Sequence, residues 1–335
     1  MIYKKRIILI DYIRALAILL VILGHFRHIF LPNYNGENHL IYFISSFGHF
    51  GVILFFGLSG ILASDRLNMI NSFSDILGYL KLRLLRIYIV LPFALLATFI
   101  FDFIALNLNL YSNISDLNII SQESSPENRL KLHLFLSNLF SLQTFTTTFF
   151  GSNGPLWSLS YEIWFYILGA LSKKIKTPLL FSFVIFIDYK FYIFFLFWYY
   201  IGNIKSLKIN NFTFSLSTII IIILHLYKPF NIDIFYCLYF IVLYHFFKNK
   251  KLPSFKPVSY LAKISFSLYI FHYPILLFIS FFLFGDSIKN FNIFQTVICT
   301  FIVFIICIKL YDFIENSNYS NALLRKVRQK LKNNA

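Results

Sequence analysis

Long apolar runs, separated by short charged or turn-rich stretches, dominate the chain. A membrane-spanning helix needs about 20 mostly apolar residues. The runs predict ten spans, over residues 7–31, 40–63, 84–106, 154–171, 178–188, 190–203, 212–228, 231–247, 261–284 and 291–311. The fifth and sixth are short and poorly separated at residues 188–190, so they could form a helical hairpin or one long, tilted helix.

The distribution of Lys and Arg chooses between these alternatives, because cytoplasmic loops of membrane proteins are enriched in basic residues. With the N-terminus inside and ten spans, the inside segments hold 22 basic residues and the outside segments hold six. Merging the fifth and sixth spans would move the basic downstream loops outside. The pattern therefore favours an all-α integral membrane protein of about ten transmembrane helices with both termini cytoplasmic.

The composition agrees with this interpretation. Hydrophobic residues make up 58% of the 335 residues and charged residues 13%, about half the charged share of a soluble domain. A soluble enzyme, a disordered chain and a disulfide scaffold are thereby excluded. In a soluble protein, the net charge of +16 would suggest nucleic acid as a binding partner. Here the positions of the basic residues are explained by the membrane topology instead. All three cysteines lie in apolar runs, which predicts buried thiols and neither a disulfide framework nor a zinc site.

Two segments are predicted not to span the membrane. The outer loop 107–153 becomes amphipathic at 130–142, which indicates an interfacial helix. The end of the chain, at 320–332, alternates leucine and valine with Lys and Arg at helical spacing, which predicts a basic amphipathic helix on the inner leaflet. We therefore expect a transmembrane domain over 1–312 and a basic cytoplasmic tail over 313–335. The basic N-terminus is interpreted as part of a retained first span rather than a cleaved signal.

The first span carries ionisable residues. Placing such residues in a membrane costs free energy, so each calls for a structural or functional explanation. Arg14 and His25 are 11 residues apart, which places them within about 20° of the same helix face and about 16 Å apart along the axis. Asp11 shares that face, one turn before Arg14. The stripe predicts a functional histidine at its outer end. The alternative is an Asp–Arg pair near the interface and a histidine satisfied by neighbouring helices.

The cytoplasmic side of the second and third spans offers candidate donor-binding residues. Ser59 lies in a glycine-rich stretch that lets backbones approach closely and could donate a hydrogen bond into a site. Arg83 and Arg86 lie one turn apart, and paired guanidinium groups suit phosphates arriving from the cytoplasm. The alternatives are glycine packing in the first case and ordinary positive-inside anchoring in the second.

Two later spans carry further candidates. Glu162 shares a helix face with Ser158 and Tyr166, and it needs a partner from another span, for which His25 is a candidate. His272 lies in the ninth span, just before Pro274, which loosens the helix. The alternatives are a carboxylic acid kept neutral by burial and a packing histidine. His225 and His245 lack a polar stripe and are interpreted as structural.

Five motifs in this order, over about residues 7–284, resemble the acyltransferase-3 family of membrane-bound glycan O-acyltransferases. They are Asp11-Tyr-Ile-Arg14 with ten residues before His25; Phe55-Phe56-Gly57-Leu58-Ser59-Gly60; Arg83-x-x-Arg86; Trp157-Ser-Leu-x-x-Glu162-x-x-Phe165-Tyr166; and Ser265-x-Ser267-Leu-Tyr269-x-x-His272-x-Pro274.

The resemblance implies an enzyme that takes an acyl group, usually acetyl, from cytoplasmic acyl-CoA and passes it to a hydroxyl of a cell-surface glycan. It marks His25 as the essential histidine and Arg83 with Arg86 as a candidate coenzyme A phosphate site. It implies acyl-CoA as co-substrate, no metal, a glycan or lipid-linked glycan acceptor, and a bacterial-type plasma membrane.

Acyl transfer to a hydroxyl requires a base near neutral pH and donors facing the developing oxyanion, which the two histidines, the glutamate and the hydroxyls can supply. We expect His25 to accept the hydroxyl proton, Glu162 to orient or stabilise its imidazole, and Arg14 to hold the donor path. A secondary transporter of a glycan, with these groups as a proton relay, is the alternative. Transporters usually contain inverted repeats, and none is visible in this sequence.

Overall fold

The computed structural model of the protein describes residues 2–31, 39–112, 114, 125–174, 188–204, 207–227, 231–285, 288 and 293–333. Within these ranges the regular structure is helical, apart from one isolated bridge between Gln143 and Thr147. The predicted helical fold class is confirmed for this part of the chain. The fifth predicted span, 178–188, lies outside the described residues except for its last residue.

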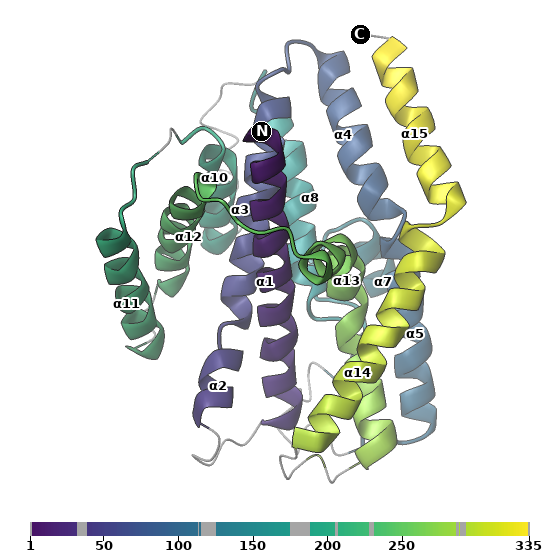
Figure 1. Ribbon diagram of the computed structural model, residues 1–335. Coiled ribbons are helices and arrows are strands. Elements are labelled where there is room, and N and C mark those ends of the chain that lie inside the picture. The colour runs from purple at the N-terminus through teal and green to yellow at the C-terminus, as the bar shows by residue number, and fades with distance from the viewer. Residues whose placement is uncertain are drawn as a thin grey trace. The chain divides into compact units, whose positions relative to one another are not determined.

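Most predicted spans coincide with one helix or with two consecutive helices (Figure 1). The helices, in chain order, are α1 (Ile2–Phe30), α2 (His39–Ser45), α3 (Gly48–Leu67), α4 (Phe73–Tyr88), α5 (Leu91–Asn107), α6 (Pro126–Arg129), α7 (Leu132–Leu139), α8 (Leu156–Leu171), α10 (Tyr189–Ile201), α11 (Asn211–Tyr227), α12 (Ile232–Lys248), α13 (Lys256–Phe284), α14 (Ile293–Leu310), the π-helical turn η3 (Tyr311–Glu315) and α15 (Asn318–Asn333). The last of these confirms the predicted helix in the tail.

The third predicted span begins earlier than expected and is interrupted. At its start, Asp75 accepts hydrogen bonds from the backbone N–H groups of Asn71 and Ser72, while the Ser72 hydroxyl accepts one from the Asp75 N–H. This reciprocal cap starts α4 at Phe73, eleven residues before the predicted boundary at 84. The interruption follows from Pro92, which lies in the first turn of α5. A proline there would clash with the preceding turn of a continuous helix, so α4 ends at Tyr88.

Five helical stretches in the described residues are long and apolar enough to cross a membrane: Ile8–Phe30, Leu40–Leu67, Phe73–Asn107, Lys256–Phe284 and Ile293–Glu315. They support an integral membrane protein. Helices α8, α10, α11 and α12 also match predicted spans but have 16, 13, 17 and 17 residues, which reach at most about 26 Å at 1.5 Å per residue. The number of ten spans and the orientation of the termini stay predictions.

Helix α14 shows how such a helix divides between protein and lipid. Its buried side chains are Cys299, Val303 and Cys307, which repeat every four residues. Its large exposed apolar side chains are Ile293 at the first position and then Phe294, Val297, Phe301 and Ile305, which repeat every three or four residues along another face. An extended exposed apolar face of this kind suits contact with acyl chains.

The described helices form two compact units. The first unit comprises Met1–Leu20, His49–Ile76 and Trp164–Lys263, and the second comprises Val21–Gly48, Leu77–Ile163 and Ile264–Ala335. Helices α1, α4, α8 and α13 contribute residues to both units, as does α3 through Gly48. The predicted site residues are therefore divided: Arg14 and Ser59 belong to the first unit, and His25, Arg83, Arg86, Glu162 and His272 belong to the second.

A close backbone approach organises the core of the first unit. A Cβ atom on Gly60 would lie 2.3 Å from the carbonyl oxygen of Trp198, so only glycine allows α3 and α10 to come this near. Trp198 is fully buried, and its indole N–H donates to the Ser59 hydroxyl at 3.1 Å. The predicted packing role of the glycine-rich stretch is confirmed here.

In the second unit, a buried carboxylate fastens the segment 125–155 to α5. Asp102 is fully buried, and its Oδ2 atom accepts a hydrogen bond from the Ser152 backbone N–H at 2.7 Å. Neighbouring Gly151 has a φ of +55°, and a Cβ there would lie 2.3 Å from the same Oδ2 atom. A glycine is therefore required on both steric and conformational grounds. The helix predicted at 130–142 forms within this segment as the shorter α7.

The same segment buries a basic residue that lies outside the predicted spans. Arg129 is 8% exposed, and its guanidinium carbon lies 3.8 Å from the centre of the Phe149 ring. Burial lowers the pKa of this guanidinium from its usual value. The Arg129 carbonyl oxygen also accepts a hydrogen bond from the Gly151 N–H at 3.2 Å. Arg129 thus acts in packing as well as contributing to the charge pattern.

Candidate functional site

Two histidines of the second unit lie close together. Helix α1 carries His25 and helix α13 carries His272, and the centres of the two imidazole rings are 5.0 Å apart. The ring of Tyr273 lies edge-on to His25 with centres 4.7 Å apart, and His28 lies 6.1 Å away. Two histidines that are 247 positions apart in the sequence thereby form one cluster.

The hydrogen bonds of His272 define which of its nitrogens is available. Its Nδ1 atom lies 2.9 Å from the carbonyl oxygens of both Leu268 and Tyr269. Carbonyl oxygens only accept, so Nδ1 carries the proton and the neutral ring keeps a lone pair on Nε2. This Nε2 atom and the Nδ1 atom of His25 are both buried and have no hydrogen-bond partner among the described residues. The cluster can therefore accept a proton or a hydroxyl donor.

The proline beside this cluster leaves one carbonyl oxygen without its helical hydrogen bond, and an asparagine that is distant in sequence donates to that oxygen. Pro274 lies inside α13 and has no N–H, so the carbonyl oxygen of Ile270, four residues earlier, lacks its helical partner. The side-chain amide of Asn153 donates to this oxygen at 3.1 Å and to the Thr98 hydroxyl at 3.0 Å. The helix remains continuous through Pro274 because the freed carbonyl is satisfied from the 125–155 segment.

Glu162 lies among tyrosines of the same unit. Its carboxylate is within electrostatic range of the hydroxyls of Tyr79 and Tyr269. The Tyr269 hydroxyl contacts the Ser158 hydroxyl and donates to the Pro155 carbonyl oxygen at 3.0 Å. The Tyr269 ring in turn lies 6.2 Å from that of His272. Tyr269 is thus common to the surroundings of the glutamate and of the histidine.

The structure places His272, rather than Glu162, beside His25. Among the described residues, His25 makes neither a hydrogen bond nor an ion pair with Glu162. The neighbours of its ring are the aromatic groups His28, His272 and Tyr273. A direct contact by which Glu162 would orient the His25 imidazole is therefore not present in this structure.

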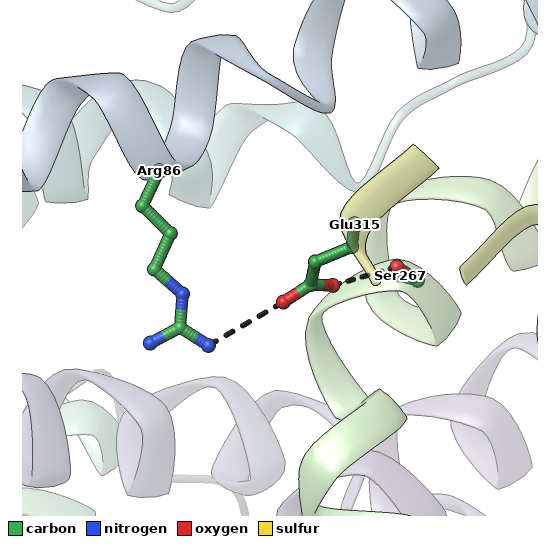
Figure 2. A network of polar contacts seen from close by, with 3 residues as sticks. All are labelled: Arg86, Ser267 and Glu315. Carbon is green, nitrogen blue, oxygen red and sulfur yellow. Dashed lines mark hydrogen bonds and ion pairs between the residues drawn. The ribbon is translucent and has the colours of Figure 1, made fainter. Parts of the chain in front are cut away.

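The two predicted phosphate-binding arginines have different surroundings. The guanidinium carbon of Arg83 lies 5.6 Å from the centre of the Tyr79 ring. Arg86 instead reaches toward the end of the chain, where its Nη2 atom lies 3.5 Å from Oε1 of Glu315. Figure 2 shows the second carboxylate oxygen of Glu315 accepting a hydrogen bond from the Ser267 hydroxyl, at 2.8 Å. Arg86 thus has an internal anionic partner that the sequence analysis did not foresee.

The first unit holds the remaining predicted residues. Ser59 is buried, and its hydroxyl is hydrogen-bonded to the Tyr166 hydroxyl at 2.8 Å and to the Trp198 indole N–H. Both contacts are internal to that unit, and a role of Ser59 toward acyl-CoA stays a prediction. Arg14 lies half-buried on α1. Its role along the donor path likewise stays a prediction.

The two histidines that the sequence analysis interprets as structural each make a hydrogen bond within the first unit. The His225 ring is hydrogen-bonded to the Tyr236 hydroxyl, and His245 Nδ1 donates to the Ile241 carbonyl oxygen at 2.9 Å. The three cysteines are free and buried. Within the described ranges, no group of three or more His, Cys, Asp or Glu side chains could hold a metal ion.

Sequence reasoning missed three residues that organise this region: Asp102, Asn153 and Glu315. Asp102 was detectable, because it is an acidic residue inside a predicted span. Asn153 could have been sought as a partner for the carbonyl that Pro274 frees, but nothing in the sequence singles it out. Glu315 follows the last apolar run, where an acidic residue is unremarkable in sequence.

Comparison with known proteins gives one match. A family model described as an acyltransferase domain, Acyl_transf_3, matches residues 7–224, which is more than half of the chain. No curated protein and no solved structure matches the chain. The matched range includes four of the five motifs quoted above and ends before the motif of α13 that carries His272.

Proposed function

The chain belongs to the acyltransferase-3 family, and on that premise we propose that it transfers an acyl group from cytoplasmic acyl-CoA to a hydroxyl of a cell-surface or exopolysaccharide glycan. The group is an acetyl group in this proposal. The apolar helices and the family together indicate a membrane acyltransferase. A bacterial-type plasma membrane is the proposed location, since it provides acyl-CoA on one side and the glycan on the other.

The observation that carries the proposal is the His25–His272 pair, in which His272 is fully buried and His25 is half-buried. Each histidine keeps one buried ring nitrogen without a hydrogen-bond partner among the described residues. Leaving a buried polar atom unsatisfied is unfavourable, so its retention in both members of a close pair supports a binding or catalytic role. Imidazole titrates near neutral pH, which suits a base that must both take up and release a proton.

In the proposed reaction, the His25 imidazole accepts the proton of the acceptor hydroxyl. The hydroxyl oxygen attacks the thioester carbonyl carbon, the carbon–sulfur bond breaks, and coenzyme A leaves as a thiol that takes up the proton. The thioester is already activated, so the step requires no nucleotide hydrolysis. His272, whose Nδ1 is held by two carbonyl groups, presents its Nε2 lone pair as an acceptor beside His25 and stabilises the charged ring.

Arginines and the glutamate have supporting roles in this proposal. Arg83 and Arg86 hold phosphates of the donor, for which guanidinium groups are well suited. Arg14 and Ser59 contact the donor along its path. Glu162 acts through Tyr269, since its carboxylate lies within electrostatic range of the Tyr269 hydroxyl and the Tyr269 ring lies 6.2 Å from that of His272.

Acetyl transfer in proteoliposomes tests this proposal directly. The purified protein is reconstituted, labelled acetyl-CoA is supplied on one side and a bacterial surface glycan on the other, and label in the glycan is measured by mass spectrometry. We expect label to appear in the glycan only with active protein. Movement of unmodified glycan across the membrane, with no acetyl transfer and no binding of acetyl-CoA, would instead identify a transporter.

A further inference from the structure

Glu315 lies where the last apolar helix gives way to the basic tail. It ends the π-helical turn η3, three residues before α15 begins. Single π-helical turns are rare and occur frequently at functional sites. The turn brings the Glu315 carboxylate between two partners from other helices, Arg86 of α4 and Ser267 of α13 (Figure 2).

The two contacts of this carboxylate differ in strength. Ser267 is fully buried and donates to Oε2 at 2.8 Å. Arg86 approaches Oε1 at 3.5 Å through one nitrogen only, and its side chain is 51% exposed against 14% for Glu315. An exposed, single-contact ion pair stabilises a protein little. Glu315 is therefore the fixed partner, and the Arg86 guanidinium is the part that can exchange this contact for another.

A carboxylate and a phosphate present the same chemistry to a guanidinium group, since both offer oxygen acceptors with negative charge. We propose that Glu315 is a further residue of the donor site, an internal anion that occupies Arg86 in the absence of acyl-CoA and thereby sets the affinity for the donor. This inference rests on the proposed function of Arg86 as a phosphate ligand. Donor phosphate replaces the carboxylate on the guanidinium, and the negative charge of Glu315 limits how tightly the phosphate is held.

A purely structural ion pair is the competing explanation, and the local hydrogen bonds argue against it. The turn after Glu315 is held by the Ser320 hydroxyl, which donates to the Ile314 carbonyl at 2.6 Å, and by the Asn316 N–H, which donates to the Tyr311 carbonyl at 2.9 Å. These bonds do not involve the Glu315 side chain. The turn can therefore keep its shape when the carboxylate charge is removed.

Glu315→Gln is the decisive substitution, because glutamine retains the size of the side chain and an oxygen that accepts from Ser267. Protein in nanodiscs of zwitterionic lipid is titrated with acetyl-CoA, and affinity and turnover are measured at low salt. We expect acetyl-CoA to bind about three- to fivefold more tightly, the scale of one exposed charge pair, with kcat changed less than about twofold. The gain should vanish when Arg86→Gln is already present.

Asp312→Asn is the matched control, because it removes the same charge from the same turn. Asp312 is exposed and contacts Asn316, at 3.4 Å, in place of an arginine. The control should leave acetyl-CoA affinity unchanged. If Arg86→Gln weakens binding but Glu315→Gln leaves it unchanged or weaker, the role of Glu315 is refuted while the proposed donor site stands. If Arg86→Gln itself has no effect on binding, the proposed donor site fails.

Discussion

The two units of the molecule differ in how their polar side chains are hydrogen-bonded. In the first unit, Ser59 is bonded to Tyr166 and Trp198, and His225 to Tyr236. His49 Nε2 lies 2.8 Å from the Asp233 carboxylate in the same unit. In the second unit, buried atoms of His25, His272, Ser152 and Asn153 have no hydrogen-bond partner among the described residues. Paired polar groups stabilise a fold, whereas a group of unpaired ones provides the capacity to bind something else.

His245 sharpens this comparison, because two features of its local hydrogen bonding are the same as those of His272. Both donate from Nδ1 to the carbonyl oxygen four residues earlier, and both keep a buried Nε2 atom without a partner among the described residues. The difference is that a second imidazole lies beside His272, while the aromatic neighbour of His245 is Tyr244 on its own helix. An unsatisfied nitrogen is therefore common to both units, and the paired imidazole is what distinguishes the candidate site.

Removing the base should have the largest effect. Loss of a general base lowers the rate by about 10²–10⁴, so His25→Ala should abolish glycan acetylation while the protein still elutes as a folded species on gel filtration. His225→Ala, which removes a paired histidine of the first unit, should keep near-normal turnover. Near-normal turnover of His25→Ala would show that His25 is not the catalytic base.

The second imidazole should matter less than the first but more than its counterpart in the first unit. We expect His272→Gln to reduce turnover by about 10²-fold, the lower end for acid–base groups, and to alter the pH profile of kcat. His245→Gln should leave both the rate and the pH profile unchanged. Equal effects of the two substitutions would show that the proximity of His272 to His25 does not contribute to turnover.

The arginines should affect the donor rather than the chemical step. Replacing both Arg83 and Arg86 by Gln removes two charge-assisted contacts and should weaken acetyl-CoA binding by at least about tenfold, since one such hydrogen bond contributes about 1.5–3 kcal/mol. The wild-type affinity should fall as salt is raised, and that of the variant should change less. Unchanged affinity in the variant would show that the two arginines only set the membrane topology and do not bind the donor.

The contact between Asn153 and α13 can be tested by stability. Asn153→Ala leaves the buried Ile270 carbonyl unsatisfied, which should cost about 1–3 kcal/mol and lower the melting temperature of the purified protein. Pro274→Ala restores a backbone N–H that can donate to the same carbonyl. The cost of Asn153→Ala should therefore be smaller in a Pro274→Ala background. The same cost in both backgrounds would contradict this account.

The smallest effect is expected in the well-paired first unit. Ser59→Ala removes a hydroxyl that accepts from Trp198 and shares a hydrogen bond with Tyr166, which should cost about 1 kcal/mol of stability, measured by the melting temperature. Ser59→Thr, which retains a hydroxyl, serves as the control. Because Ser59 is also proposed to contact the donor, Ser59→Ala should in addition raise KM for acetyl-CoA, and an unchanged KM would limit the hydroxyl to packing.

The sequence by itself determined the helical fold, the membrane character and the family. Apolar runs, glycine-rich packing stretches and prolines act over neighbouring residues, so α1, α8, α12 and α13 lie close to the predicted ranges. The boundary of α4 was wrong because a short polar cap, Ser72 with Asp75, extends a helix beyond its apolar part. The motif residues were recognisable for the same reason, since each motif lies within one helix.

Only the tertiary structure decided which of these residues meet. His25 and His272 are adjacent because α1 and α13 pack together, and no local pattern encodes that contact. The sequence suggested Glu162 as the partner of His25 from similar depth alone, and depth does not determine which helices are neighbours. The partners Asn153 of Ile270 and Glu315 of Arg86 were invisible for the same physical reason: hydrogen bonds and ion pairs between distant segments depend on packing that involves the whole unit.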